Sequence, residues 1–541
     1  KKKNRKYFYN NMIKRTHIGF IFLGSILLLL SSRVITSDVF ASTESIKEML
    51  RAEKELIEPL DDCIEKETER LREIKELRDK IKDEIEWVKE SSSLDCYVGN
   101  PLNAMYAIRR FPNVWSKIHK LINNTNHCTG FGRVYKSHRA KFPDINDANA
   151  AVSAILRLQH YYKINANDLS KGVVTKAKTR AKPMDITIKS ELGITAINEK
   201  KWELSKGWFN EALKEFSPSQ DVKEGIQRNL ILKRLARVEI RLGNYEKALE
   251  LNLQLNKSLP RDTQVDKNIR ECEKLTKNEE EKQKMKKETR SKNDLMSQYE
   301  ALCRGEKLRN LTSTNEVSNL VCWYNNKHPL LRYKPQKVER VWLEPEILIY
   351  RNLLNDRQCH LLIEGSKSKL KRANLMRDNN QAIQTDKRTS KHAWLTSHDV
   401  PIITQMEKRA QAITNLNMKS ADQLQVNNYG LGGHYEFHYD WARNNVQEVF
   451  GPRGNRIATL MYYLSDVDGG GGTAFVNGKT TIFPTKGDAV FWWNLKRNGE
   501  GDQTNLHGGC PVLAGQKWVA NWWIHEVGQE FRRPCLKDPN K

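Results

Sequence analysis

The sequence predicts a multidomain α+β protein in which a helical N-terminal half precedes a β-rich C-terminal half. Three observations predict this arrangement. Apolar residues recur every three or four positions over residues 42–90, short strands rich in aromatic and β-branched residues alternate with glycine turns beyond about residue 336, and residues 273–294 are almost all charged or polar. A chain of 541 residues also exceeds what one hydrophobic core supports, so several domains are expected.

The first predicted element is a long amphipathic helix over residues 42–90. Its apolar positions form a stripe that fits a coiled coil, and hence a dimer: Ile46, Met49, Ile57, Leu60, Ile64, Leu71, Ile74, Leu77, Ile81, Ile85 and Val88. Pro59 and Glu67 interrupt that seam, so a helix packed on its own domain is the alternative. With further helices, including Ala150–Tyr162, residues 42–172 form a predicted helical N-terminal and dimerisation domain.

Two helical hairpins are expected within residues 185–262. In the second, four residues stand at the offsets of a tetratricopeptide repeat: Gly243, Tyr245, Ala248 and Pro260. Small residues let two helices approach closely, and proline ends the second helix. One repeat is a weak indication, so a helical bundle is an equally good interpretation. A charged linker at 273–298 and a connector at 299–335 are predicted to follow.

The β-rich domain is predicted over residues 336–541, with its core at about 420–528. Strands are expected at Leu424–Tyr429, Ile457–Leu464, Ala489–Trp493 and Trp518–Ile524, and helices before them at Asp356–Leu370 and Pro401–Thr414. Many short strands in one block are typical of a sandwich or a jelly roll.

A secretory signal peptide is predicted at the start of the chain. The apolar run Ile18–Leu30 follows Lys14 and Arg15, and its length suits a signal-peptide core better than a membrane span. Small residues favour cleavage before Ser42. Met12 is the expected initiator, so residues 1–11 are interpreted as upstream sequence and residues 1–41 as removed. A signal anchor is the alternative; otherwise no membrane span is expected in the mature chain.

A secretory leader predicts the endoplasmic reticulum lumen, where cysteines can pair. Of nine cysteines, two pairs are favoured because Cys303 and Cys322 flank a short polar loop and Cys510 and Cys535 bracket the last strands. N-glycosylation is predicted at Asn123 and Asn310, each of which begins an Asn-x-Ser/Thr sequon.

His438 and Asp440 are the first candidate metal ligands. Residues two apart on a strand point to the same face, so both side chains can reach one ion. His507, which lies 67 residues beyond Asp440, supplies the third ligand. Two histidines and one carboxylate form the facial triad that leaves coordination positions open on Fe(II). A zinc hydrolase is the competing interpretation, and it is disfavoured because no pattern such as His-Glu-x-x-His is found.

Lys517 is the candidate partner of an acidic cosubstrate. It lies ten residues after His507, at the start of a predicted strand whose tryptophans mark an apolar setting. A buried ammonium there could pair with the distal carboxylate of 2-oxoglutarate while that molecule chelates iron. A lysine at the exposed end of a strand is the alternative interpretation.

Several longer motifs then carry a resemblance to a known family. The C-terminal motifs are Asn428–Asp440, Gly454–Thr459, Tyr463–Val467, Gly487–Trp492 and His525–Cys535, and the upstream ones are Leu156–Gln159, Ser170–Gly172 and Tyr299–Glu306. Together they closely resemble the α subunits of animal collagen prolyl 4-hydroxylases, over essentially the whole mature chain.

The resemblance implies a fold, an activity and an assembly. The C-terminal domain would be a double-stranded β-helix that hydroxylates peptidyl proline at C4 with Fe(II), 2-oxoglutarate and O₂, with L-ascorbate rescuing oxidised iron. Residues 185–262 would bind the peptide. The chain would assemble as two α and two β subunits, the β subunit being protein disulfide isomerase.

Site roles also follow from the resemblance. The metal ligands map to His438, Asp440 and His507, and the cosubstrate residues to Lys517, Tyr429, Thr473 and His525. Substrate-side positions map to Tyr435, Arg456 and Trp523, and the family disulfides to Cys303–Cys322 and Cys510–Cys535. For the substrate-side positions, strand packing is the plainer interpretation.

The chain also departs from the family. Arg234, Arg237 and Ile240 stand where a tyrosine-lined peptide groove is expected, and Phe437 replaces a usual proline. The natural peptide is therefore open: a 2-oxoglutarate oxygenase acting on a different secretory peptide and a non-catalytic peptide-binding assembly subunit are the alternatives. The presence of all three ligands and Lys517 argues against the second.

The positive net charge is typical of proteins that bind nucleic acids, but the way in which the charges are distributed along the chain does not support such a partner. The chain has 91 basic and 66 acidic residues, a formal charge of +25. Residues 1–41 hold eight of the basic and one of the acidic residues, which leaves 83 and 65, or +18. These alternate along helices, and no nucleic-acid-binding module is recognisable. The 45 aromatic residues (13 Trp, 17 Tyr and 15 Phe) exclude a fully disordered chain.

Overall fold

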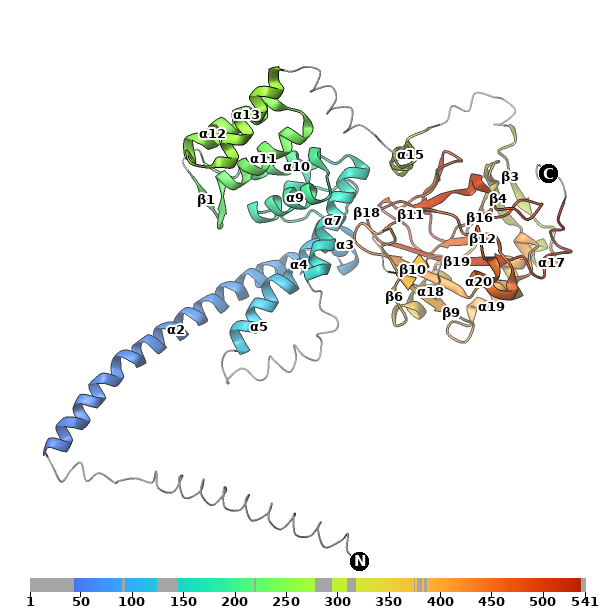
Figure 1. Ribbon diagram of the computed structural model, residues 1–541. Coiled ribbons are helices and arrows are strands. Elements are labelled where there is room, and N and C mark those ends of the chain that lie inside the picture. Colours follow the sequence, from blue (N-terminus) through green and yellow to red (C-terminus); the bar gives the residue numbers. More distant parts are fainter. Residues whose placement is uncertain are drawn as a thin grey trace, which may run out of the picture. The chain divides into compact units, whose positions relative to one another are not determined.

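The computed structural model describes most of the chain after the predicted leader (Figure 1). The described residues are 43–89, 93–123, 145–217, 220–277, 294–308, 318–373, 375–376, 382–383 and 387–536. The leader and the side chains of Asn123 and Asn310 lie outside them. Residues 1–82 and 83–541 form two compact units, and each is described by itself.

Helix α2 (Thr43–Lys89) confirms the predicted long helix. Three of its apolar side chains are exposed in the single chain, at positions that differ by multiples of seven: Ile64, Leu71 and Ile85. A spacing of seven is the repeat of a coiled-coil seam, so these residues suit a pairing surface. The pairing itself stays a prediction.

The second unit begins with helices that confirm the predicted helical half. They are α3 (Leu94–Gly99), α4 (Pro101–Arg110), α5 (Ser116–Asn123), α7 (Ile145–Tyr162), α8 (Ala166–Ser170), α9 (Ile186–Asn198), α10 (Trp202–Leu213), α11 (Arg228–Leu242), α12 (Tyr245–Ser258), α13 (Thr263–Lys277) and α15 (Asp294–Cys303). A π-helical turn, Phe111–Trp115, joins α4 to α5, and a two-stranded ribbon, β1 (Val222–Lys223) and β2 (Ile226–Gln227), precedes α11.

Local sequence explains where the helices α9 to α12 begin, end and approach one another. Asp185 caps α9 by accepting a hydrogen bond from the Ile188 amide. Gly243 ends α11 in the left-handed region at φ 76°, which glycine adopts without strain. A Cβ on Gly193 would lie 2.6 Å from the Phe209 ring, so glycine is needed for α9 to approach α10. The helices α9–α10 and α11–α12 thus form the two expected hairpins, with α13 after them.

A nine-stranded antiparallel sheet forms the larger layer of the C-terminal half (Figure 1). Its order is β3 (Cys322–Asn325), β4 (Gln336–Trp342), β5 (Ile347–Arg351), β16 (Ala489–Trp493), β12 (Arg456–Tyr463), β19 (Lys517–His525), β10 (Leu424–Tyr429), β9 (Lys391–Leu395) and β6 (Lys371–Arg372). The four predicted strands are confirmed as β10, β12, β16 and β19.

A second, four-stranded sheet carries much of the site. Its order is β11 (Tyr435–His438), β17 (His507–Gly509), β14 (Thr473–Phe475) and β15 (Thr480–Ile482). Two ribbons complete the strands, β13 (Gly469–Gly470) with β18 (Val512–Ala514) and β7 (Leu375–Met376) with β8 (Ala382–Ile383). Helices α17 (Pro329–Arg332), α18 (Asp356–Lys367), α19 (Ile402–Thr414) and α20 (Val446–Phe450) lie between strands in the sequence.

Both faces of the large sheet are buried. Successive residues of its strands point to opposite faces, so one strand contributes side chains to two core clusters. On β19, Trp518, Ala520 and Trp522 pack into one core cluster together with α18 and α19. Val519, from the opposite face, packs with Phe475 of the small sheet in a second cluster. Polar residues on that second face can therefore meet residues of the small sheet in the space between the two sheets.

The disulfide in the structure joins Cys303 to Cys510, so the predicted pairs Cys303–Cys322 and Cys510–Cys535 are wrong. Cys303 ends α15, which packs on β14 and β15, and the Cα atoms of Cys303 and Cys510 lie 5.4 Å apart. Cys322 lies in the edge strand β3 and Cys535 follows β19, where both are exposed and free. Proximity along the chain suggested pairs that tertiary packing does not form.

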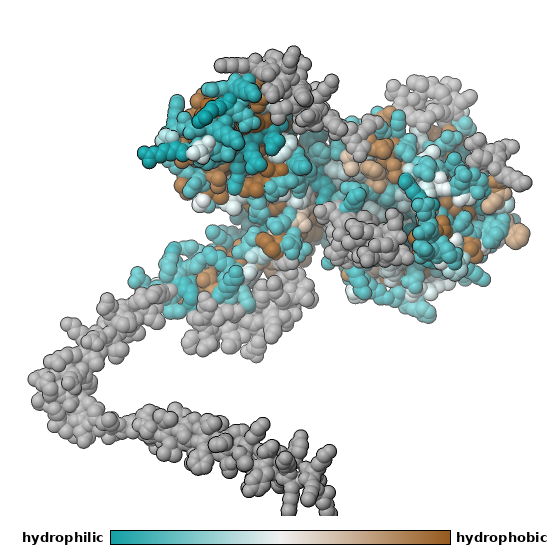
Figure 2. Space-filling model, in the orientation of Figure 1, coloured by the Kyte–Doolittle hydropathy of each residue, from teal (hydrophilic) through white to brown (hydrophobic). Residues whose placement is uncertain are grey.

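No helix in the described part of the chain is long and apolar enough for a membrane span. Figure 2 shows hydrophilic residues over most of the coloured surface, as expected from a mean hydropathy of −0.70.

We expect non-reducing peptide mapping to recover one peptide that links Cys303 to Cys510. The double variant Cys303→Ser/Cys510→Ser is expected to lose about 2–4 kcal/mol of unfolding free energy, because the bond closes a long loop. Cys322→Ser, at an exposed free thiol, is the control and should leave stability unchanged. Recovery of a Cys303–Cys322 peptide from the wild type would contradict the pairing.

Candidate functional site

The three predicted metal ligands meet at the pairing of β11 with β17. These strands are antiparallel, and His438 lies directly opposite His507. Asp440 lies in a bend two residues after His438, beyond the end of β11, so the two ligands meet although Asp440 is not on the strand as predicted. The His438 Nε2 atom lies 3.6 Å from Asp440 Oδ1, and the His507 Nε2 atom lies 3.5 Å from Asp440 Oδ2. One donor atom from each residue falls within 4.8 Å of the others.

Hydrogen bonds around the triad orient its donor atoms. His438 Nδ1 donates to the Glu436 carbonyl at 2.8 Å, and His507 Nδ1 donates to the Asn505 carbonyl at 2.8 Å. Each Nε2 is therefore left with its lone pair toward Asp440. The Thr459 hydroxyl donates to Asp440 Oδ2 at 2.7 Å and itself accepts from Asn494.

The electrostatics of the triad suit a cation. Burial alone would raise the pKa of Asp440, but His507, His438 and Arg456 outweigh it and hold that pKa below its ordinary value. Burial lowers the pKa of His507 to about 4, so its imidazole is neutral. Two imidazole nitrogens and one carboxylate at these distances fit Fe(II), for which this donor set is typical.

Lys517 lies on the face of the large sheet that is turned toward the small sheet. Its surroundings suit an acidic ligand. It begins β19 opposite Tyr429 of β10, and its Nζ lies 5.0 Å from the centre of the Tyr429 ring. The side chain is 2% exposed, and within the described ranges no carboxylate forms an ion pair with it. Burial lowers its pKa to about 7. An ammonium buried without an anion is costly, so this position suits a ligand that brings a carboxylate.

Tyr429 adjoins Lys517 and Thr473 pairs with Gly509 of β17, whereas His525 has other partners. The Thr473 hydroxyl lies 2.9 Å from that of Tyr463, between the two sheets. His525 donates from Nδ1 to the Gly454 carbonyl at 2.7 Å, and its Nε2 lies 3.4 Å from Asp422. A part for His525 in cosubstrate binding therefore stays a prediction.

The three residues predicted to lie on the substrate side contact the triad directly or through one another. The Tyr435 ring stacks on the His438 imidazole, with 3.6 Å between centroids and an interplanar angle of 19°. The Arg456 guanidinium lies 4.1 Å from the centre of the Trp523 ring and forms an ion pair with Asp422 at 2.8 Å. Nη1 of Arg456 also contacts the Asp440 carbonyl at 3.5 Å, which links this group to the metal ligands.

Comparisons with known proteins agree with this geometry. A family described as the 2OG-Fe(II) oxygenase superfamily matches residues 424–525, and one described as the N-terminal region of the prolyl 4-hydroxylase alpha subunit matches residues 42–176. Prolyl 4-hydroxylase subunit alpha-2 of Caenorhabditis elegans is 32% identical over 94% of this chain and 95% of its own length. Subunit alpha-1 of Homo sapiens is also 32% identical, over 94% and 97%.

The chain belongs to the prolyl 4-hydroxylase alpha subunits. Among solved structures, the viral collagen prolyl hydroxylase of Paramecium Bursaria Chlorella virus-1, in its 2OG complex, is 28% identical with a TM-score of 0.28, over 34% of this chain and 96% of that one. The matching family models and the prolyl 4-hydroxylase relatives show that the chain is an Fe(II)- and 2-oxoglutarate-dependent prolyl hydroxylase, and its His-Asp-His triad is the group that can hold the iron.

Sequence reasoning missed two residues that contact the predicted substrate-side residues of this prolyl 4-hydroxylase. Arg388 lies with its guanidinium 4.7 Å from the Tyr435 ring centre and donates to Gln425 and Asn427 at 3.0 and 2.8 Å. Asp422 binds Arg453 and Arg456 together. Arg388 lies in a segment without strand periodicity, so no local pattern marked it, and Asp422 precedes its strand by two residues like any turn aspartate.

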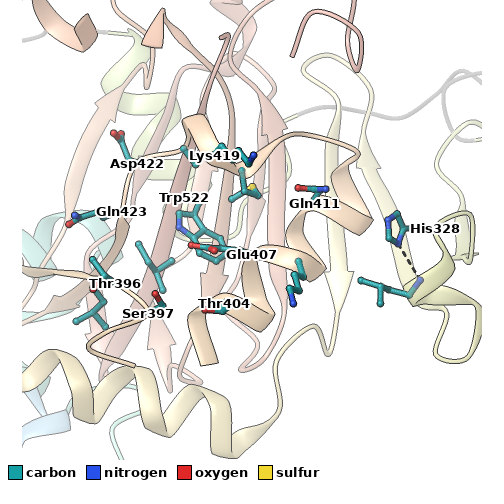
Figure 3. Close-up of a pocket in the computed structure, with 16 residues that line it drawn as sticks. His328, Thr396, Ser397, Thr404, Glu407, Gln411, Lys419, Asp422, Gln423 and Trp522 are labelled. Carbon is teal, nitrogen blue, oxygen red and sulfur yellow. Dashed lines mark hydrogen bonds between the residues drawn. The ribbon is translucent and has the colours of Figure 1, made fainter. Parts of the chain in front are cut away.

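A cavity among the described residues lies elsewhere. It has a volume of about 440 Å³, and none of the three ligands lines it. Figure 3 shows Glu407 and Trp522 near its middle, with Asp422 at its margin. Trp522 belongs to the core cluster under α18 and α19, so this hollow faces the side of the sheet away from the triad. The chemistry of the donor set identifies the site here, and cavity size does not.

Lys517→Met is expected to weaken 2-oxoglutarate binding by about 10–100-fold, because a charge-assisted hydrogen bond is worth roughly 1.5–3 kcal/mol. Without cosubstrate the same variant should melt no lower than the wild type, since it removes an unpaired buried charge. Calorimetric titration and thermal melting measure both effects. Lys486→Met, at a lysine paired on the surface with Asp356, is the control and should change neither. Unchanged 2-oxoglutarate affinity in Lys517→Met would contradict the assignment.

Proposed function

We propose that this prolyl 4-hydroxylase alpha subunit modifies procollagen-like chains at C4 of proline. One oxygen atom of O₂ enters the proline hydroxyl and the other enters succinate, as 2-oxoglutarate loses CO₂. The observation that supports this most is the triad of His438, Asp440 and His507 beside the buried, unpaired ammonium of Lys517. Iron bound there would supply the coupled oxidation of a C–H bond and of 2-oxoglutarate.

The chain's own residues would organise that reaction. The carbonyl-bonded histidines and the Thr459 hydroxyl keep the three donor atoms pointing to one place. Lys517, together with Tyr429 and Thr473, would bind the distal carboxylate of the cosubstrate. The apolar cluster between the sheets, which includes Phe475, would exclude water from the reacting atoms.

Three buried polar atoms suggest where the peptide lies. Arg388 Nε, Asn521 Oδ1 and Trp523 Nε1 are buried without a hydrogen-bond partner. Asn521 and Trp523 lie two residues apart on β19, on the same face as Lys517. The Arg388 guanidinium lies over the Tyr435 ring. Orphaned buried polar groups are costly, so they suit a ligand that satisfies them. We propose that peptide backbone groups of the substrate bind these atoms.

The finer fold assignments are also proposals. Two facing antiparallel sheets, with the site between them, support a double-stranded β-helix, or jelly roll, for residues 336–541. The consecutive hairpins α9–α10 and α11–α12 support tetratricopeptide-like repeats over residues 185–262. A dimerisation domain at residues 42–172 rests on the exposed seam of α2.

We further propose the endoplasmic reticulum lumen as the compartment. A disulfide between Cys303 and Cys510 suits an oxidising environment. The predicted signal peptide, the sequons at Asn123 and Asn310, L-ascorbate as reductant, and protein disulfide isomerase in a tetramer of two α and two β chains belong to the same proposal and rest on the sequence.

The proposal is tested by co-expressing the full chain with protein disulfide isomerase and measuring succinate formation with Pro-Pro-Gly repeat peptides, Fe(II) and ascorbate. Turnover that requires the peptide is expected, and His438→Ala should reduce it at least about 1,000-fold, because a metal ligand is lost. Wild-type enzyme without peptide-dependent turnover would contradict the collagen-like substrate, and an active His438→Ala variant would contradict the metal site.

A different secretory peptide is the second candidate substrate, and α11 favours it. Arg234 and Arg237 lie three residues apart on one helix face, and neither has an acidic partner among the described residues. Burial lowers the pKa of Arg234, which means that its charge is partly desolvated. Unpaired guanidinium groups at this position suit a peptide that carries carboxylates.

Arg234→Tyr/Arg237→Tyr is expected to raise KM for proline peptides with flanking glutamates and to leave or lower KM for neutral Pro-Pro-Gly repeats. The effect on the acidic peptide should be about 5–50-fold and should shrink with salt, because it is electrostatic. Lys247→Tyr, at a lysine already paired with Glu250, controls for the loss of charge. Equal changes for both peptides would contradict a preference for acidic chains.

A further inference from the structure

The edge strand β11 carries His438 and leads to Asp440, yet its own backbone pairing is sparse. It is four residues long and lies at one end of the small sheet, where only β17 pairs with it within that sheet. The register between the two strands is irregular between Tyr435 and His438. On its other side β11 has an isolated bridge to Arg388, a hydrogen bond from the Glu436 amide to the Lys387 carbonyl and one from the Thr389 amide to the His434 carbonyl. Backbone hydrogen bonds alone are therefore a limited restraint on two of the three ligands.

One buried side chain from outside the sheet touches both ligand strands. Tyr299, in α15, is fully buried, and its hydroxyl donates to the Tyr435 carbonyl at 3.3 Å. Its ring meets Phe437 edge-on, with 5.6 Å between centroids. A Cβ on Gly508 would lie 3.0 Å from the Tyr299 ring, so the ring also packs against β17.

These contacts concern the immediate neighbours of the ligands. Phe437 precedes His438, Gly508 follows His507, and the Tyr435 ring stacks on the His438 imidazole. A single rigid ring thus contacts the residue next to each histidine. Restraints of this kind set ligand geometry without contacting the metal.

The other edge of Tyr299 faces the helical half. Its ring meets Tyr161 of α7 edge-on at 6.0 Å, and Arg304 donates to the Tyr161 carbonyl at 2.8 Å. His160 lies 3.0 Å from the Glu300 carboxylate. The disulfide from Cys303 ties the end of α15 to Cys510, directly after β17, the strand that begins at His507. Tyr161, Tyr299 and Phe437 therefore form a continuous row of rings from α7 to the metal ligands.

We propose that Tyr299 is a positioning residue of the hydroxylase, which holds β11 against β17 and so sets the spacing of His438 and His507. Through Tyr161 it makes the geometry of the metal site depend on the helical half. Tyr299 contacts neither metal nor substrate, so its effect is on ligand placement. The inference rests on the metal site and not on the identity of the peptide.

The test is the affinity of the full chain for Co(II) alone, measured by calorimetry without peptide or 2-oxoglutarate. Tyr299→Leu removes the ring and the hydroxyl, and we expect at least about tenfold weaker binding, the effect typical of residues that orient metal ligands. Tyr299→Phe removes only the hydroxyl and should weaken binding by about two- to fivefold, as for one neutral hydrogen bond.

Tyr350 provides a matched control. It is buried on the other face of the large sheet, its hydroxyl donates to the Ile413 carbonyl at 3.4 Å, and its ring meets Phe491 edge-on. Tyr350→Leu should lower the melting temperature as Tyr299→Leu does and leave Co(II) affinity unchanged.

Weaker Co(II) binding confined to the Tyr299 variants supports the proposal. Equal Co(II) affinities in Tyr299→Leu, Tyr350→Leu and wild type overturn it, and so does equal weakening in both variants, which would indicate general loosening. If Tyr299→Leu does not fold, Tyr299→Phe against Tyr350→Phe decides in the same way. A failure to hydroxylate collagen-like peptides would leave this readout untouched.

Discussion

The antiparallel pairing of β11 with β17 is the constraint on which the rest of the site depends. It sets His438 opposite His507, and the bend that follows β11 then brings Asp440 to the same place. The hydrogen bonds to Glu436 and Asn505 select the tautomers, but they act only because the strands are already in register. Everything around the pair either restrains it, as Tyr299 does, or supplies polar groups beside it.

The site contains several buried polar groups that lack an ion-pair or hydrogen-bond partner. Lys517 is an ammonium without an anion, and Arg388 Nε and Trp523 Nε1 lack hydrogen-bond partners. Such groups cost free energy in the folded chain, and the large apolar clusters on both faces of the nine-stranded sheet offset that cost. An enzyme that binds two acidic or polar ligands between its sheets gains those interactions only when the ligands arrive.

The helical half and the β-rich half meet through α7 and α15. Tyr161 and Tyr299 reach the strand that carries His438, and Arg157 of α7 donates to the Gly432 carbonyl in the turn before that strand. The proposed peptide-binding helices thus adjoin elements that support the metal site. This arrangement offers a physical route by which the two halves influence each other, and the coupling itself remains to be measured.

Much of the site could be predicted, because the sequence patterns that mark its residues span only a few positions. The aromatic and β-branched residues of Leu424–Tyr429 and Trp518–Ile524 predicted strands, and the two-residue spacing of His438 and Asp440 predicted that both reach one ion. The closeness of His507 to these two was a hypothesis from residue types, since a separation of 67 residues along the chain does not predict a contact in space. Arg388 and Asp422 could not be found this way, because their function depends on the neighbours that packing gives them.

The sequence by itself determined which elements form and which residues offer metal-binding chemistry, since periodicity, caps and residue types act over a few positions. Only the tertiary structure decided the partners of residues far apart in the chain. It joined Cys303 to Cys510 rather than to Cys322, and it left Lys517 without an anion. The physical reason is that such pairings follow from how α15 and two sheets pack together, and no local pattern encodes that packing.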